Sequence, residues 1–427
     1  MDIHDHLDRW TKVFCEYSYN NEMYAQLCFH LVCGQMWKRR FIYKRAQRID
    51  GRISIGVFWD SSGGKSAPYG FVKEALESAG KTVNDLDDYT DAALVGTWTE
   101  DPDAEDGEDN LVLEEGIIQL SDVIHFDEAS TLFVETAHTK KAVTFLEKAL
   151  NPIGSAQSLI VKKLARGPPI EFYSDLSLYL TSYIPEGLGE EFLNKGLMQR
   201  VIILPKRLTY ANRVDNIRTD ADGLGRKTVV PAEYEAIMEW VSNEAQQENA
   251  RVQQGIPHEW IWDDVREYVK NRNVRLLALT QNLDQGVQGV ANSMIARYVN
   301  FMYVIATHCA SISARTRITK EDVDYAYALI RDLFEFILPF LEMDAGIAKK
   351  GGKEERLMKE LRKLHTRLLQ NHPDRPQTKE GWVLKSDLWS LAETELHTSS
   401  STLYRATKDC DWLTETTIKR KKYVKIV

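Results

Sequence analysis

The sequence predicts an α/β core with a mostly parallel sheet, then an all-helical region and a small C-terminal unit. Strand-like and helix-like apolar segments alternate over residues 46–206, which is the pattern of parallel strands joined by crossover helices. From residue 231 to 341 nearly every segment has the period of an amphipathic helix. A linker-like stretch at 345–352 precedes a basic segment at 353–427.

The composition is that of a globular protein with room for several cores. The chain has 427 residues, of which 43% are hydrophobic and 27% charged, so two or three domains of about 150 residues are expected. Apolar runs are shorter than the ~20 residues that a membrane helix requires, and the N-terminus is acidic rather than secretory. The five cysteines are scattered, which favours reduced thiols in a cytoplasmic protein.

The elements of the core follow from apolar periodicity. Residues 1–45 carry apolar side chains at three- and four-residue steps and are expected to be helical. Further strands and helices are predicted at the following segments: strands at 51–59, 123–126, 176–183 and 200–204, and helices at 67–79, 139–150 and 188–197. The acidic stretch from 84 to 115, with nine carboxylates between Glu100 and Glu115, is interpreted as a solvated surface loop. Residues 159–172 favour a hairpin with Gly-Pro-Pro at its tip.

A phosphate-binding loop is predicted between the strand at 51–59 and the helix at 67–79. Residues 59–66 are Trp-Asp-Ser-Ser-Gly-Gly-Lys-Ser, which matches the end of G-x-x-x-x-G-K-[ST] but places Trp59 at the first glycine. Backbone amides of such a turn and the helix that follows bind phosphate. Lys65 is expected to reach the β- and γ-phosphates, and Ser66 to bind Mg²⁺ through its hydroxyl. The predicted nucleotide-binding residues of the loop are Ser62, Gly63, Gly64, Lys65 and Ser66. The alternative is an ordinary glycine-rich turn.

An Asp-Glu pair completes the pattern. Asp127 and Glu128 follow the apolar run at 123–126. In P-loop ATPases an aspartate at this position binds Mg²⁺ and the glutamate polarises the attacking water. His125, inside the run, is interpreted as a core or surface histidine rather than a catalytic one.

With these motifs the sequence resembles the minichromosome maintenance (MCM) branch of AAA+ ATPases, the replicative helicases of archaea and eukaryotes. The resemblance extends to residues 296–310 and to Ile-Thr-Lys-Glu-Asp at 318–322, where Thr319 and Asp322 predict a helix cap. It implies the following organisation: an N-terminal helical segment at 1–45, a P-loop AAA+ α/β core at 46–210, an all-α lid at 211–345 and a winged helix-turn-helix at 353–427. The family's N-terminal OB-fold half has no counterpart, as in replication proteins of plasmids, viruses and other mobile elements.

The resemblance also implies ATP and Mg²⁺ as cofactors and roles for two arginines. Arg200 corresponds to the arginine finger and Arg297 to the sensor-2 arginine, and both act on the nucleotide of a neighbouring subunit. Such residues require a ring, for which a homo-hexamer is expected. Thr181 and Ser182 are the polar candidates on the sensor strand, where the family has an asparagine, and Ser182 is assigned to the nucleotide. Ordinary arginines that pack on carboxylates or face solvent are the alternative.

DNA, single-stranded or forked, is the expected partner. The hairpin at 159–172 lies where the family carries a lysine into its central channel. The winged helix would add small polar and basic residues on its recognition helix and a basic wing. The predicted DNA-binding residues are Lys162, Lys163, Arg166, Ser399, Ser400, Arg405, Lys408, Lys419, Arg420, Lys421 and Lys422. A winged helix that docks protein, and an exposed basic loop without special function, are the alternatives.

The predicted function is an ATP-dependent DNA helicase or translocase that acts in replication, and the alternative is an ATP-regulated replication initiator without processive motor activity. The formal charge of −9 argues against DNA binding only when it is averaged over the whole chain. Residues 346–427 have 18 Lys and Arg against 11 Asp and Glu, a balance of +7, which leaves −16 on residues 1–345. Contact of the acidic body with DNA must therefore come from local basic loops.

Overall fold

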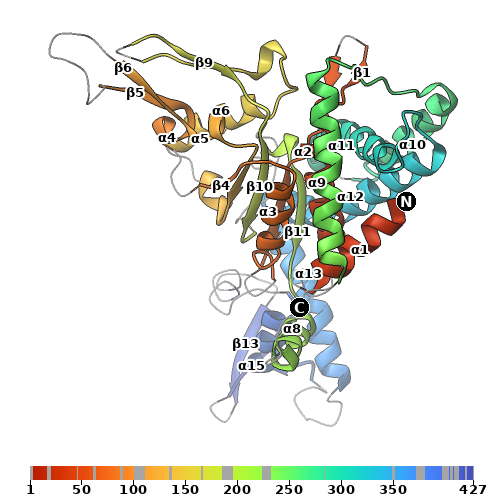
Figure 1. Ribbon diagram of the computed structural model, residues 1–427. Helices are drawn as coiled ribbons and strands as arrows, with labels where there is room; N and C mark the ends of the chain where they lie inside the picture. Colours follow the sequence, from red (N-terminus) through yellow and green to blue (C-terminus); the bar gives the residue numbers. More distant parts are fainter. Residues whose placement is uncertain are drawn as a thin grey trace. The chain divides into compact units, whose positions relative to one another are not determined.

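The structure is a computed structural model that divides into two compact units (Figure 1). It describes residues 3–16, 21–45, 47–60, 64–86, 90–100, 111–133, 137–164, 167–184, 196–223, 232–283, 285–348, 352–371, 380–396, 403, 407, 413–418 and 421–426. The larger unit contains residues 1–208 and 213–342, and the smaller one residues 209–212 and 343–427.

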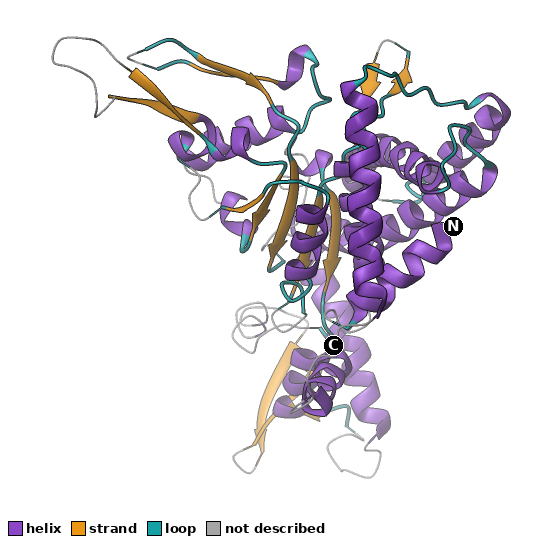
Figure 2. Cartoon of the chain, in the orientation of Figure 1, coloured by secondary structure: helices purple, strands orange, loops and turns teal. Residues whose placement is uncertain are grey.

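A five-stranded parallel sheet in the order β11-β3-β10-β7-β4 forms the centre of the larger unit. Its strands are β3 (Ile55–Trp59), β4 (Val83–Asp85), β7 (Val123–Phe126), β10 (Ser177–Ser182) and β11 (Ile202–Lys206). Every residue of β3, β7 and β10 is buried, as expected for parallel strands covered on both faces. Figure 2 shows helices on both sides of this sheet. The predicted parallel α/β sheet is therefore confirmed.

The helices before the C-terminal unit have the following bounds: α1 (Ile3–Cys15), α2 (Glu22–Met36), α3 (Tyr69–Ser78), α4 (Asp91–Val95), α5 (Ile117–Leu120), α6 (Ala137–Ala149), α8 (Tyr210–Gly223), α9 (Ala232–Gln253), α10 (Arg266–Ala278), α11 (Gln285–Ile312) and α12 (Lys320–Ala348). Helix α2 is buried along most of its length and packs on β3. Trp10 of α1 contacts Phe71 of α3, with ring centroids 4.6 Å apart. The N-terminal helices thus belong to the core that carries the sheet.

Two predicted boundaries differ from the structure. Residues 1–45 do not end as helix, because β1 (Ile42–Lys44) pairs with β2 (Gln47–Ile49) in an antiparallel hairpin. The acidic stretch at 84–115 is not only a loop, because it contains α4 and a second hairpin, β5 (Gly96–Glu100) with β6 (Leu111–Glu115). Gly96 allows this hairpin to begin: its φ is 100°, and a Cβ would lie 2.4 Å from the carbonyl oxygen of Glu114.

The hairpin predicted at 159–172 is present as β8 (Leu159–Lys162) and β9 (Ile170–Tyr173). It is joined to the β5-β6 hairpin at two places. The indole nitrogen of Trp98 donates a hydrogen bond of 2.9 Å to the carbonyl of Pro168, and the Lys162 ammonium donates to the carbonyls of Asp91 and Gly96. Figure 1 shows both hairpins projecting together from the sheet.

The predicted cap of the last long helix is confirmed. The backbone amide of Thr319 donates to the Asp322 carboxylate at 2.8 Å, and the amide of Asp322 lies 3.4 Å from the Thr319 hydroxyl. This reciprocal pair is a capping box in which aspartate takes the place of the usual glutamate. Helix α12 begins at Lys320 and continues through Ala348, so the first four residues of the linker expected at 345–352 are helical.

The smaller unit combines helices with a three-stranded antiparallel sheet. Its described elements are α13 (Gly352–Asn371), β12 (Val383–Leu384), α15 (Lys385–Glu395), β13 (Leu413–Ile418) and β14 (Lys421–Ile426), with β14 central. Its core is formed by Leu361, Leu364, Val383, Leu388, Trp389, Ala392, Leu403 and Val424. The sequence places the recognition helix of the predicted winged helix at 398–409, and of these residues the structure describes Leu403 and Thr407, both helical.

Two buried histidines join α2 to α11 and α12. His30 Nδ1 lies 3.2 Å from His308 Nδ1, and His30 Nε2 lies 3.1 Å from the Tyr325 hydroxyl. His308 Nε2 lies 2.9 Å from the carbonyl oxygen of Gly51, and a carbonyl can only accept a hydrogen bond, so this nitrogen carries hydrogen. The remaining contacts are then satisfied when both rings are neutral, with His30 Nδ1 donating to His308 and Tyr325 donating to His30.

Acid is therefore expected to destabilise the protein. Burial lowers the pKa of His30 well below its ordinary value and that of His308 to about 4, whereas in the unfolded chain both titrate near 6.5. The two neutral histidines stabilise the folded state fully above pH ~6.5. This contribution is lost as the pH falls toward 4, because the histidines of the unfolded chain bind protons at a higher pH than those of the folded chain. We expect the free energy of unfolding to fall by about 1.4 kcal/mol per histidine per pH unit in this window. Urea unfolding between pH 7.5 and 5 measures the slope, and His308→Gln should reduce it by the contribution of one histidine.

Candidate functional site

The residues predicted to bind and hydrolyse nucleotide lie at the carboxyl edge of the sheet. Lys65 and Ser66 lie between the end of β3 and helix α3, and Asp127 and Glu128 directly follow β7. Strand β10 lies between β3 and β7 and pairs in parallel with both. Parallel strands present their carboxyl ends at one edge, where ligands of such sheets bind. The fold therefore brings the two motifs to one region.

Lys65 extends to the end of β10. Its Nζ lies 4.2 Å from the ring centroid of Tyr183, which directly follows that strand. Its carbonyl accepts a hydrogen bond of 2.6 Å from the Tyr24 hydroxyl of helix α2. The preceding Gly64 has a φ of 71°, the left-handed region that favours glycine. Of the loop residues predicted to bind nucleotide, Ser62 and Gly63 lie outside the described residues.

Trp59, the departure from the loop pattern, is a core residue. Its side chain is fully buried, and its indole nitrogen donates a hydrogen bond of 3.1 Å to the carbonyl of Leu204 in β11. Its ring lies 5.2 Å from that of Tyr24. The tryptophan thus packs between β11 and helix α2. Helix α2 also contacts the phosphate loop directly, because the Tyr24 hydroxyl donates to the carbonyl of Lys65.

Asp127 and Glu128 are exposed at the turn after β7. The Thr181 hydroxyl donates a hydrogen bond of 2.8 Å to Asp127 Oδ1. Glu128 has a φ of 56°, a conformation that costs a non-glycine residue energy and is concentrated at functional sites. Ser182, predicted to contact the nucleotide, accepts a hydrogen bond of 2.9 Å from the amide of Ser130. Of the two polar candidates on β10, Thr181 is the one that contacts the Asp-Glu motif.

The oxygen donors at this edge fit Mg²⁺ bound together with phosphates. Within the described ranges, no group of three or more His, Cys, Asp or Glu could hold a metal ion. Mg²⁺ in nucleotide sites needs no such cage, because one or two protein oxygens, substrate phosphates and water complete its shell. The exposed Ser66 hydroxyl and Asp127 carboxylate are oxygens of this kind.

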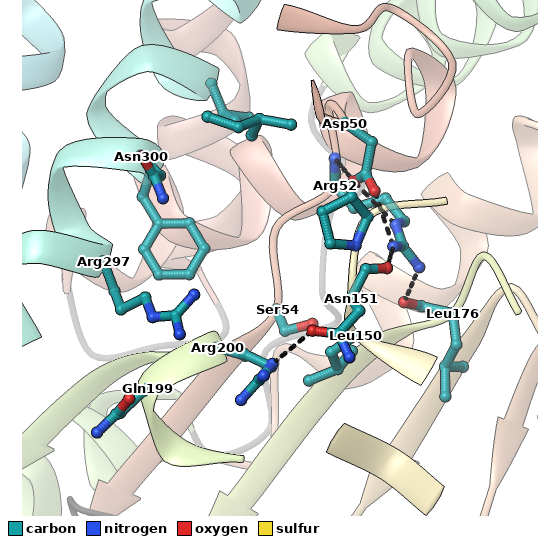
Figure 3. A pocket seen from close by; sticks show the side chains of 14 residues that line it. Asp50, Arg52, Ser54, Leu150, Asn151, Leu176, Gln199, Arg200, Arg297 and Asn300 are labelled. Atoms are coloured by element: carbon teal, nitrogen blue, oxygen red, sulfur yellow. Dashed lines mark hydrogen bonds and ion pairs between the residues drawn. The ribbon is translucent and has the colours of Figure 1, made fainter. Parts of the chain in front are cut away.

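A pocket at the opposite, amino-terminal edge of the sheet contains Arg200 and Arg297 (Figure 3). Ser54, just before β3, and Leu176, just before β10, also line it. Arg200 donates to the Asn151 side chain at 3.1 Å. Burial and the neighbouring Arg297 guanidinium lower the pKa of Arg200. Among the residues that the structure describes, neither arginine has a carboxylate within ion-pair distance.

The same pocket holds a third arginine with a different role. Arg52 donates to both carboxylate oxygens of Asp50 and to the carbonyls of Ala149, Asn151 and Leu176. Its guanidinium is satisfied by the fold, whereas the guanidinium of Arg297 is exposed. Figure 3 shows the Asp50–Arg52 pair on one side of the pocket and Arg200 with Arg297 on the other.

The structure does not bring the two candidate arginines to the phosphate loop of their own chain. The five residues of β3 separate the edges, and at about 3.3 Å per residue this is roughly 16 Å. Lys65 and Asp127 are therefore assembled within one chain, and Arg200 and Arg297 form a separate cationic group.

The residues predicted to contact DNA differ in whether the structure exposes them to solvent. Lys162 is 7% exposed, and its ammonium is bound by the carbonyls of Asp91 and Gly96, so the prediction that it contacts DNA is wrong for this conformation. Lys163 is exposed on the same hairpin, and Lys421 and Lys422 are exposed on β14. The predicted residues that lie outside the described ranges are Arg166, Ser399, Ser400, Arg405, Lys408, Lys419 and Arg420.

Comparison with known protein families and with curated proteins finds no match to this chain. None of the described helices has the length and apolar character needed to cross a membrane.

Proposed function

We propose that the protein is an ATPase whose active sites form between neighbouring copies in a ring, and that it acts on DNA as a replicative helicase or translocase. The observation that carries the proposal is the division of charge between the two edges of the sheet. Lys65, Ser66 and Asp127 lie at one edge, and Arg200 and Arg297 at the other. A nucleotide held at the first edge can meet the arginines only when a second copy presents the second edge.

In this proposal each residue has a specific task in phosphoryl transfer. Lys65 binds the β- and γ-phosphates, and Ser66 and Asp127 hold the magnesium ion, which neutralises phosphate charge when bound. Glu128 orients the attacking water and draws its proton. Arg200 of the next copy stabilises the charge that develops on the transferred phosphoryl group. Arg200 has no ion pair with the described carboxylates of its own chain. Its Nε bonds the Asn151 side chain and its Nη1 the carbonyl of Gly196, so we assign its Nη2 to the anion.

A closed ring follows from the same arrangement. A contact between the carboxyl edge of one copy and the amino edge of the next is heterologous, because the two surfaces differ. Such contacts close into a ring when the rotation permits, and every site then receives its arginines. From the resemblance to MCM proteins we propose a ring of six copies.

The support for DNA as partner comes from charge and exposure. Lys163 is exposed on a projecting hairpin, and Lys421 and Lys422 on the smaller unit. Residues 346–427 carry a formal balance of +7. Phosphate contacts of this kind bind DNA without reading its sequence.

ATP turnover with and without single-stranded DNA tests the proposal. The wild type should hydrolyse ATP, and Lys65→Ala should abolish both nucleotide binding and turnover. Lys206→Ala is the matched control, because Lys206 lies at the same edge but stacks on Trp59 with its Nζ 4.9 Å from the ring centroid. A wild type without any turnover refutes the ATPase. Turnover without strand displacement on a forked duplex would favour the replication initiator.

A further inference from the structure

Four side chains, from β4, β7, β10 and the turn after β7, form a series of contacts at hydrogen-bond distance that ends at Asp127. Asp85 Oδ1 at the end of β4 lies 2.8 Å from His125 Nδ1 in β7. His125 Nε2 lies 3.1 Å from the Thr181 hydroxyl in β10. That hydroxyl lies 2.8 Å from Asp127 Oδ1. The series therefore connects the outermost strand of the sheet to the carboxylate proposed to bind Mg²⁺.

The direction of these bonds follows from the donors and acceptors present. The pKa of Asp85 is lowered by its contacts with His125, Tyr69 and Lys73, in spite of partial burial, so Asp85 is a carboxylate that only accepts and His125 Nδ1 carries hydrogen. The Thr181 hydroxyl has one hydrogen. Asp127 Oδ1, His125 Nε2 and the carbonyl oxygen of Phe126 all lie within hydrogen-bond distance of it, so it donates to one of them at a time. Its oxygen is held between them, which restricts where the Asp127 carboxylate can lie.

His125 is also joined to the helix that follows the predicted phosphate loop. The ring of Tyr69, the first residue of α3, stacks on the imidazole with centroids 3.8 Å apart and an angle of 19° between the planes. Lys73 of the same helix lies 3.5 Å from the Asp85 carboxylate. Tyr69 is three residues after Ser66 and its amide donates to the Ser66 carbonyl at 3.2 Å. One histidine thus contacts both halves of the site.

We propose that His125 is a positioning residue that fixes Asp127 through Thr181, and the Ser66 segment through Tyr69, for a shared magnesium ion. The inference rests on the proposed nucleotide site. His125 is 5% exposed, and burying two ring nitrogens in a strand costs energy unless both are bonded. An apolar side chain would serve packing alone. Removal of a group that hydrogen-bonds to a metal ligand and orients it commonly weakens metal binding about 10-fold to 100-fold.

Four substitutions at three positions separate this role from simple packing. Thr181→Val removes the hydroxyl and keeps the shape, and Thr181→Ser restores the hydroxyl. His125→Phe keeps the stack on Tyr69 and removes both hydrogen bonds. Asp85→Asn changes a side chain that is 47% exposed and therefore tests the far end of the series with little risk to folding.

Binding of a fluorescent ATP analogue, measured against Mg²⁺ concentration and in excess EDTA, tests the inference without relying on turnover. We expect Thr181→Val and His125→Phe to raise the half-saturating Mg²⁺ concentration about 10-fold or more, and Asp85→Asn to raise it less. Binding in EDTA should stay at the wild-type level, and Thr181→Ser should behave as wild type. A purely structural role would instead weaken binding equally with and without Mg²⁺.

The outcomes distinguish this inference from the proposed function. If the wild type binds nucleotide with Mg²⁺, and Thr181→Val and Asp85→Asn have the same half-saturating Mg²⁺ concentration as the wild type, the positioning role is overturned and the ATPase proposal stands. If the wild type binds no nucleotide under any condition, the proposed function itself fails and the positioning role falls with it.

Discussion

Arg200→Ala is expected to lower ATP turnover by a factor of about 10³ or more while nucleotide binding persists. Arg200 lies in the pocket at the amino edge of the sheet, a strand length away from Lys65 of its own chain. Its loss removes a cation from the transition state of the neighbouring site but leaves the loop that binds ATP intact. Steady-state turnover and binding of a fluorescent ATP analogue measure the two effects separately. Gln199→Ala is the matched control, because Gln199 lines the same pocket without charge.

Mixing two inactive variants makes this expectation specific to the interface. Lys65→Ala chains still present Arg200, and Arg200→Ala chains still present Lys65. In rings formed at random from equal amounts, about one interface in four joins two intact halves. Turnover should therefore reappear on mixing and approach a quarter of the wild-type rate. Activity of Arg200→Ala alone at the wild-type level, or no recovery in mixed rings of confirmed stoichiometry, contradicts a site shared between copies.

The parallel sheet was predictable because three of its strands are mainly apolar runs. Strands β3, β7 and β11 lie within or beside the segments that the sequence indicates, since strands buried on both faces carry little polar alternation. Strand β4 has only three residues, two of them Asn84 and Asp85, and so resembles a polar loop. The order of the strands depends on pairings between distant segments, which local periodicity does not contain.

The site was predictable only where a motif is contiguous in sequence. Lys65, Ser66, Asp127 and Glu128 follow local patterns. The contacts that position these residues cannot be found from local patterns. Tyr24, which contacts Lys65, is 41 residues away in the sequence, and Thr181, which contacts Asp127, is 54 residues away.

Lys162 shows the same limit for charged residues. Its basic side chain on a hairpin predicts contact with phosphate, but the fold places two backbone carbonyls within reach of the ammonium. Hydrogen bonds to backbone groups are specified by the tertiary structure, and a lysine that makes them is indistinguishable in sequence from one in solvent.

Glu128→Gly is expected to stabilise the protein and abolish ATP turnover. Glu128 has a φ of 56°, which glycine adopts without the clash that a Cβ creates. After the extra entropy of glycine in the unfolded chain is subtracted, the free energy of unfolding should rise by about 0.5–1 kcal/mol. Turnover should be lost because no carboxylate then orients the attacking water.

Two further variants separate the strain from the chemistry. Glu128→Gln keeps the left-handed backbone and removes the charge, so it should lose turnover without becoming more stable. Ala314→Gly relieves a φ of 51° just after the end of α11 and should raise the unfolding free energy by a similar amount with turnover unchanged. Urea unfolding and ATP hydrolysis provide the two measurements. A Glu128→Gly protein that is less stable than wild type, or that still hydrolyses ATP, would refute the role of this strained glutamate. A gain in stability at the cost of turnover would mean that the conformation of Glu128 is retained for the reaction and not for the fold.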